Sequence, residues 1–119
     1  MIQAEGKYWT DKEGISINTF PGSPTFNRIA VVVTRVDDSA NVGQFGQLVC
    51  TYSDDGGTTW STPVPAGLFG ATFAQPLFLP DGSLAIVYER ANPNPSVSIW
   101  MTVWSPRMGA RRSGSLSRC

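Results

Sequence analysis

The sequence contains no histidine and is poor in both cysteine and charged residues. Without histidine, the chain lacks the side chain most often used as a general base and as a zinc ligand. Its two cysteines, Cys50 and Cys119, are too few for a disulfide framework, so we expect none. Charged residues make up 15% of the chain, nine basic and nine acidic, which excludes a bulk electrostatic attraction to nucleic acid.

Long apolar runs and helical patterns are also missing. No run approaches the ~18 residues of a membrane-spanning helix, so we expect no membrane partner. The opening residues MIQAEGKYW have neither the basic flank nor the apolar centre of a signal peptide. Twelve glycines and nine prolines, without convincing helical periodicity, favour short strands joined by turns. The composition therefore predicts an all-β protein.

Two apolar segments of similar sequence reveal an internal repeat. IAVVVTR at residues 29–35 matches LAIVYER at residues 84–90, within a unit of about 50 residues. Asp81 and Gly82 form a strong tight-turn signal before the second segment. We expect strands at residues 28–36, 47–52, 58–61, 73–79, 84–89 and 97–104. Four short antiparallel strands in each repeat predict the blades of a β-propeller.

The segment SDDGGTTW has the spacing S-x-D-x-G-x-T-W, and every position of that motif is filled. The motif residues are Ser53, Asp55, Gly57, Thr59 and Trp60. This is the Asp-box, or bacterial neuraminidase repeat, and with it the chain resembles the sialidase family over most of residues 28–105. The resemblance implies about two four-stranded antiparallel blades of a sialidase-like, six-bladed β-propeller.

The physics of the motif favours a structural role. An aspartate in a turn accepts hydrogen bonds from nearby backbone N–H groups, which suits Asp55 as a lock on the turn better than as a catalytic acid. Gly57 can take a positive φ, and Trp60 can bury its ring beneath the turn. The motif lacks the series of oxygen ligands that a calcium loop needs, so we expect no metal.

The resemblance also divides the chain. The expected parts are a remnant of a preceding blade with the entry to the next (residues 1–23), a blade with the Asp-box (24–66), most of the following blade (67–105) and an irregular tail (106–119). The tail could be a solvated basic segment that binds anions. The alternative is an out-of-frame reading, since dropping two bases from suitable codons turns PRMGARR into PDGGAT and, with Ser105, completes another Asp-box.

The resemblance implies that substrate binds on the face opposite the Asp-box, where the inner strands begin. Sialidases use three arginines to clamp the substrate carboxylate, a Tyr–Glu nucleophile pair and an Asp acid/base, and arginine suits a carboxylate because its planar fork bonds both oxygens. No tyrosine here matches the nucleophile, so the catalytic residues stay unassigned. The candidate substrate-binding residues are Arg90, Arg35, Glu89 and Gln75. Since Arg35 and Arg90 occupy equivalent repeat positions, strand-end salt bridges with Asp37 or Glu89 are the structural alternative.

The resemblance implies a fragment of an exo-acting glycoside hydrolase that releases sialic acid or a related sugar acid, without a cofactor. We expect the chain to be inactive alone, because a propeller site is assembled from several blades. One alternative is a non-catalytic Asp-box propeller that binds carbohydrate or protein. Another is a damaged reading frame without a function of its own.

Overall fold

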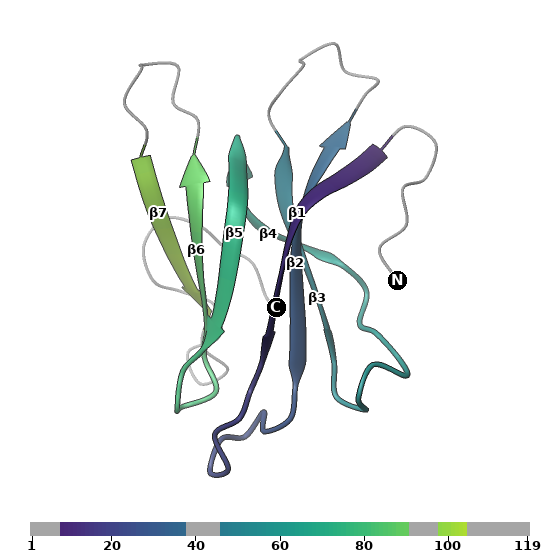
Figure 1. Cartoon of the computed structure of the whole chain (residues 1–119), viewed down its shortest axis with the longest axis vertical. Coiled ribbons are helices and arrows are strands. Elements are labelled where there is room, and N and C mark those ends of the chain that lie inside the picture. Colours follow the sequence, from purple (N-terminus) through teal and green to yellow (C-terminus); the bar gives the residue numbers. More distant parts are fainter. Residues whose placement is uncertain (1–7, 38–45, 91–97, 105–119) are drawn as a thin grey trace.

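The computed structural model describes residues 8–37, 46–90 and 98–104, which form two antiparallel sheets and no helix (Figure 1). Sheet 1 has the strand order β1-β2-β3-β4, and sheet 2 has the order β5-β6-β7. The strands are β1 (Tyr8–Ile17), β2 (Ile29–Asp37), β3 (Gln47–Ser53), β4 (Val64–Phe69), β5 (Ala71–Phe78), β6 (Leu84–Arg90) and β7 (Ser98–Trp104). The all-β prediction is confirmed for these residues.

The expected outer strand at residues 58–61 is wrong. Residues in this segment are held by the turn: Thr59 donates its backbone N–H to Asp55, and Ser61 donates its own to Tyr52 O at 2.8 Å. The chain returns to the sheet only afterwards, where Val64 of β4 pairs with Cys50 of β3. The outer strand of sheet 1 is therefore β4.

Strand pairing shows which sheet each part of the chain joins. β1 pairs with β2 along most of its length, from Tyr8↔Asp37 to Ile17↔Ile29, so residues 8–17 belong to sheet 1. The chain passes from sheet 1 to sheet 2 at Gly70 rather than between residues 66 and 67. The tail at 106–119 lies outside the described residues.

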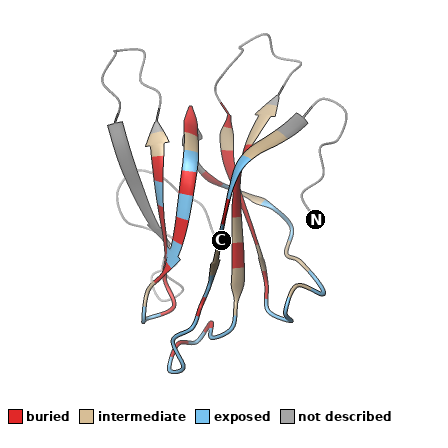
Figure 2. Cartoon of the chain, viewed as in Figure 1, coloured by how far each residue is buried: buried red, intermediate tan, exposed pale blue. Residues whose placement is uncertain are grey.

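The hydrophobic core lies between the two sheets, which pack face to face (Figure 2). The core consists of Ala30, Val32, Leu48, Cys50 and Ala66 from sheet 1, with Ala71, Ala74, Phe78, Leu84, Ile86 and Tyr88 from sheet 2. Gly14 of β1 permits a close approach of the two sheets, because a Cβ there would overlap the backbone oxygen of Ala74 and lie 2.7 Å from Pro76 Cδ. The absence of a side chain at Gly14 thus sets how closely β5 packs on β1.

Cys50 is buried in this core and is disulfide-bonded. The sequence was expected to form no disulfide framework, and two cysteines indeed exclude several bridges. The chain's other cysteine, Cys119, lies outside the described residues.

Both sheets carry the same irregularity in their first strand. The register of β1 against β2 shifts between Asp11 and Gly14, and Lys12 within that shift has φ 55°. The register of β5 against β6 shifts between Thr72 and Gln75, and Phe73 within it has φ 52°. Positive φ is uncommon outside glycine, so its occurrence within both β-bulges indicates that the first strands of the two sheets share the same local backbone conformation.

The two bulges fall at the same position of the sequence repeat. Gly14 after the first bulge pairs with Val32, and Gln75 after the second pairs with Val87. Val32 and Val87 are the fourth residues of IAVVVTR and LAIVYER. The two sheets therefore repeat one structural unit, including a strained backbone position that neither segment's composition dictates.

The connections between strands separate into two ends of the molecule (Figure 1). Residues 18–28, 54–63 and 79–83 form one end, which we call the Asp-box end. The pairs Arg35↔Gln47 and Ala71↔Arg90 lie at the other, which we call the Arg35 end. The Asp-box and the Asp81-Gly82 turn therefore lie at the same end of the molecule.

Candidate functional site

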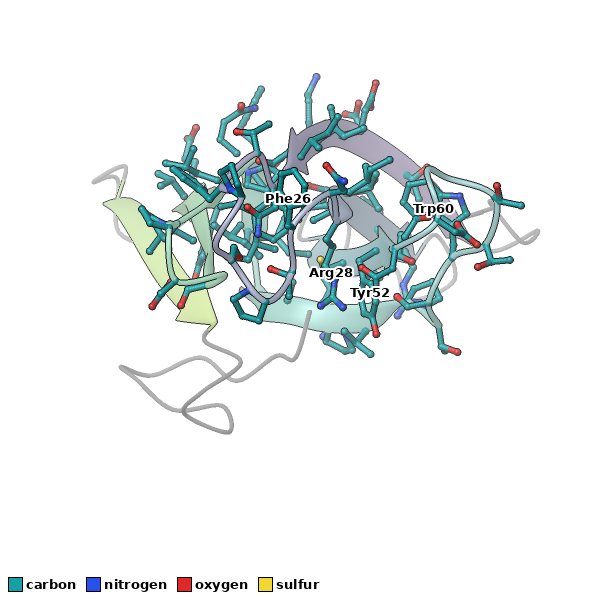
Figure 3. All side chains as sticks on the ribbon, turned by 90° about the horizontal axis from the view of Figure 1, so that it is seen from below. Phe26, Arg28, Tyr52 and Trp60 are labelled. Carbon is teal, nitrogen blue, oxygen red and sulfur yellow. The ribbon has the colours of Figure 1, made fainter. Side chains whose placement is uncertain are left out.

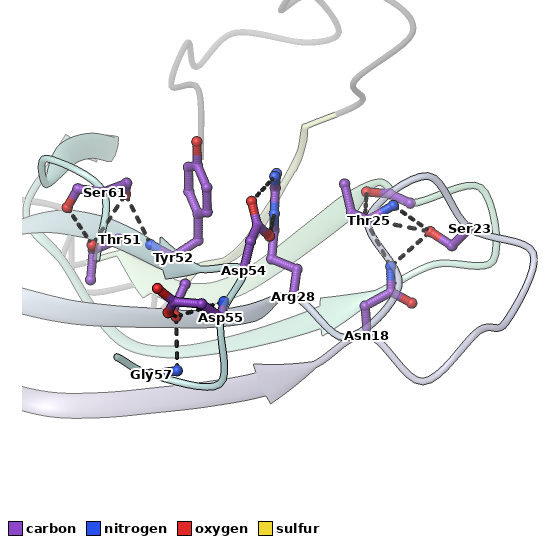
Figure 4. A network of polar contacts seen from close by, with 12 residues as sticks. Asn18, Ser23, Thr25, Arg28, Thr51, Tyr52, Asp54, Asp55, Gly57 and Ser61 are labelled. Carbon is purple, nitrogen blue, oxygen red and sulfur yellow. Dashed lines mark hydrogen bonds and ion pairs between the residues drawn. The ribbon is translucent and has the colours of Figure 1, made fainter. Parts of the chain in front are cut away.

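The Asp-box begins where β3 ends, at Ser53, whose side chain is buried. The Ser53 hydroxyl donates to Asp55 Oδ1 at 2.8 Å and accepts the Gly57 N–H at 2.9 Å (Figure 4). One small side chain thus holds both the carboxylate and the backbone of the turn. A serine suits this position because its hydroxyl donates and accepts at once.

Asp55 directs its carboxylate at the far side of the turn. It accepts the Thr59 hydroxyl at 2.5 Å and the Thr59 N–H at 2.8 Å. These bonds from Thr59, first from its side chain and then from its backbone, together with the Ser53 hydroxyl, lower the pKa of Asp55 from 3.8 to about 2. At neutral pH the group is therefore ionised and has no proton to donate as a general acid.

The glycines and the tryptophan of the motif complete the turn. Gly56 and Gly57 have φ of 71° and 92°, in the region that disfavours side chains. The indole Nε1 of Trp60 donates to Gly57 O at 3.0 Å, and its ring is half-buried (Figure 3). Every residue of the S-x-D-x-G-x-T-W pattern thus takes part in the geometry of a rigid turn.

A cation beside the Asp-box was missed by the sequence interpretation. Arg28, just before β2, bonds both carboxylate oxygens of Asp54 at 2.7 Å and stacks 4.0 Å from the centre of the Tyr52 ring (Figures 3 and 4). Arg28 therefore fixes the start of β2 to the turn after β3. No sequence signal points to it, because Asp54 fills an unspecified position of the motif.

A second polar cluster at the same end surrounds Asn18, a fully buried residue. Its amide Nδ2 donates to Ser23 Oγ at 2.7 Å and to Thr25 Oγ1 at 2.8 Å (Figure 4). The Thr25 hydroxyl in turn donates to the backbone oxygen of Gly82 at 3.3 Å. The β1–β2 connection is thereby tied to the β5–β6 turn of the other sheet.

The candidate substrate-binding residues lie away from the Asp-box. Arg35 pairs with Gln47 and Thr10, and Arg90 is the last residue of β6, where it pairs with Ala71 and Ser98. Both positions are at the Arg35 end, as the repeat predicts. Their equivalence follows from strand register.

Two further candidates lie near that end. Glu89 is half-buried next to Arg90 in β6, and Gln75 is exposed on β5, just after the bulge. The Gln75 amide donates to Ala74 O at 3.3 Å. Strand register therefore brings Arg35, Arg90 and Glu89 to one end, with Gln75 farther along its strand.

The bulges add a cation and an aromatic ring that the sequence did not single out together. Lys12 Nζ lies 5.2 Å from the centre of the Phe73 ring, and both side chains are exposed. Lys12 Nζ also lies 3.5 Å from Asp11 Oδ2. A positive φ at a lysine has no sequence signature, so the juxtaposition becomes visible only in the structure.

No protein-family model, curated protein or solved structure matches this chain. Within residues 8–37, 46–90 and 98–104, no three His, Cys, Asp or Glu residues are grouped to hold a metal ion. The same ranges include no helix with the length and apolar character of a membrane span.

The low pKa of Asp55 predicts how the stability of the turn depends on pH. Because the folded pKa, about 2, lies below the unfolded value of 3.8, the stabilisation is complete above pH 3.8 and is lost as the pH falls towards 2. We expect the melting temperature of the native chain to exceed that of Asp55→Asn by a margin that shrinks over this range. Circular dichroism melts of both proteins at several pH values measure it, and a margin independent of pH would contradict the assignment.

Proposed function

We propose that the two sheets are blades of a sialidase-like Asp-box β-propeller and that the Arg35 end faces its ligand, a sialic-acid-type sugar. In the complete propeller the proposed activity is exo-glycosidic release of that sugar. The chain alone contributes binding groups without a full set of catalytic residues. The protein holds the sugar by its carboxylate, whose two oxygens accept hydrogen bonds from the guanidinium group of an arginine.

The repeated bulge is the observation that carries the proposal. Sheets 1 and 2 share strand order, antiparallel pairing and a positive-φ residue at the same repeat position. A propeller is built from such repeated sheets packed face to face around an axis. The filled Asp-box after β3 adds the motif by which the chain resembles sialidases.

A second candidate is a non-catalytic glycan-binding propeller module. Tyr88 is buried between the sheets and Tyr52 lies at the Asp-box end beneath Arg28, so neither can act as a nucleophile on a sugar bound at the Arg35 end. The third tyrosine, Tyr8, begins β1 at the Arg35 end, where it pairs with Asp37. Hydrolysis needs an assigned nucleophile and an assigned acid, whereas binding does not.

Sialic acid binding by the purified chain tests the proposed ligand end. We expect weak, saturable binding in ligand-observed NMR, reduced at least tenfold by the paired substitution Arg35→Ala and Arg90→Ala. Arg28→Ala is the matched control, because it removes an arginine from the Asp-box end and should leave binding unchanged. Equal binding by the native chain and the paired variant would overturn the assignment of the Arg35 end.

Release of a fluorogenic aglycone from a sialic acid glycoside separates the two candidate functions. We expect no turnover by the chain alone, since positioning without a nucleophile or an acid leaves no covalent or proton-transfer step. Turnover in a monomeric sample that disappears in Arg90→Ala would show a complete site and contradict this expectation.

A further inference from the structure

Each sheet has one face that the other sheet does not cover, and both uncovered faces carry exposed apolar side chains. On sheet 1, Ile15 and Ile17 of β1 are 66% and 52% exposed. On sheet 2, Leu77 of β5 and Val87 of β6 are 59% and 37% exposed. We call these the outer face of sheet 1 and the outer face of sheet 2.

The outer face of sheet 1 corresponds to the buried face of sheet 2. Ile15 pairs with Val31, and Pro76 pairs with Ile86, where Val31 and Ile86 are equivalent in the repeat. The exposed Ile15 therefore occupies the position of Pro76, which is buried against Gly14.

The next residue pair along the same strands shows the same relation between an exposed position in sheet 1 and a buried position in sheet 2. Ile17 pairs with Ile29, and Phe78 pairs with Leu84, again at equivalent repeat positions. The exposed Ile17 thus occupies the position of Phe78, which belongs to the core. At these two β1 positions sheet 1 exposes side chains where sheet 2 buries them, whereas Val33 and Val49 on the same face of β2 and β3 are buried.

The converse holds for the outer face of sheet 2. Val87 is the repeat equivalent of Val32, which is fully buried in the core. Leu77 pairs with Ala85, and Ala85 is the repeat equivalent of the fully buried Ala30. Val87 is therefore exposed at a position that sheet 1 buries, and Leu77 is exposed beside it, whereas Ala85 itself is buried.

We propose that copies of this chain associate head to tail, the outer face of sheet 2 in one copy packing on the outer face of sheet 1 in the next. The contact repeats between copies the packing that joins sheets 1 and 2 within a copy. It rests on the equivalence of the two sheets as blades and is independent of any glycan. Such a contact is heterologous, so the copies build a closed ring or an open chain rather than a two-fold dimer.

One difference weakens the contact between copies. Gln75 stands in sheet 2 where sheet 1 has Gly14, the residue that lets β5 approach β1. A glutamine side chain holds the incoming strand farther away. The association is therefore weaker than the internal packing and depends on concentration.

Complementary single-face variants test the proposal. Ile15→Asp blocks the outer face of sheet 1, and Leu77→Asp blocks the outer face of sheet 2. Light scattering after size-exclusion chromatography should show that the native chain associates with rising concentration and that each variant alone is monomeric. An equal mixture of the two variants should form a dimer of one copy of each and nothing larger, because each supplies the face that the other has lost.

Phe26→Asp is the matched control, since Phe26 is an exposed apolar residue in the β1–β2 connection and belongs to neither face. It should associate as the native chain does. Because both test positions are exposed, the variants should retain the native circular dichroism spectrum. Ile17→Asp with Val87→Asp provides a second pair if one variant unfolds.

Three outcomes would overturn the proposal. A native chain that stays monomeric at all concentrations would show that another segment or a different protein covers the faces. A single variant that still self-associates would show a contact between like faces. A mixture of the two folded variants that remains monomeric would show that the outer faces do not bind each other. Sialic acid binding at the Arg35 end is measured separately, so its failure is distinguishable from these.

Discussion

Gly14→Ala is expected to lower the free energy of unfolding by about 1–3 kcal/mol, the usual effect of overpacking a close contact. The new Cβ would overlap the backbone oxygen of Ala74 and lie 2.7 Å from Pro76 Cδ. Neither atom is the end of a flexible side chain, so β5 itself must move away from β1. Chemical denaturation followed by tryptophan fluorescence measures the change.

Gly22→Ala is the control for this substitution. A Cβ on Gly22 meets nothing within 4 Å, and Gly22 lies in the exposed part of the β1–β2 connection. Its effect should stay within about 0.5 kcal/mol, as at other unconstrained surface sites. Equal effects of the two substitutions would show that the sheets are not closely packed at Gly14.

Asn18→Ala should destabilise the chain by about 2–4 kcal/mol, because the substitution leaves buried hydroxyl groups without their donor. The Asn18 amide donates to Ser23 Oγ and Thr25 Oγ1, and its Oδ1 accepts the Phe20 N–H at 3.1 Å. All three bonds are lost together in the alanine variant. Denaturation curves recorded as for Gly14→Ala provide the measurement.

Two further substitutions identify the cause of the destabilisation by Asn18→Ala. Thr19→Ala changes the exposed neighbour and should have little effect. Asn18→Asp keeps the size and the acceptor oxygen but removes the amide donors, so it should destabilise nearly as much as Asn18→Ala at neutral pH. An aspartate variant as stable as the native chain would mean that the donors contribute nothing.

Local sequence signals predicted the parts of the fold that local chemistry determines. The Asp81-Gly82 signal corresponds to a turn in which Gly82 has φ 86° and Ser83 N–H bonds the Asp81 carboxylate at 2.9 Å. Alternating and β-branched segments located β2, β3, β5, β6 and β7. In each case the residues within a short window are sufficient to favour the observed conformation.

Other parts depend on pairing with a neighbouring strand rather than on their own residues, and could not be predicted in this way. β1 and β4 have mixed polar and glycine-containing sequences and become strands because they extend an existing sheet. Pro21 and Pro76 precede the two matching segments by the same number of residues, whereas strand pairing aligns Pro76 with Ile15. The β1–β2 connection, residues 18–28, is longer than the β5–β6 connection, residues 79–83, and this displaces the match.

The candidate site likewise has one part that the sequence predicted and one part that it did not. The shared end of Arg35 and Arg90 followed from their repeat positions, because equivalent residues of equivalent strands must lie at the same end. The approach of Lys12 to Phe73 did not, since it requires two bulges and the packing of β5 on β1. Sequence thus predicts where a residue lies along its strand better than which side chains meet between strands.

The contacts that join the two sheets differ for the two repeats, and they fix which repeat comes first along the chain. A Cβ on Gly82 would lie 2.9 Å from Ser23 Oγ and 3.0 Å from Thr25 Oγ1, so the second repeat's turn fits only under the long connection of the first. Gly14 likewise belongs to the first repeat and has Gln75 as its counterpart in the second. Each of these contacts joins one sheet to a feature that the other sheet lacks, so the two sheets could not exchange places in the chain and keep the same packing.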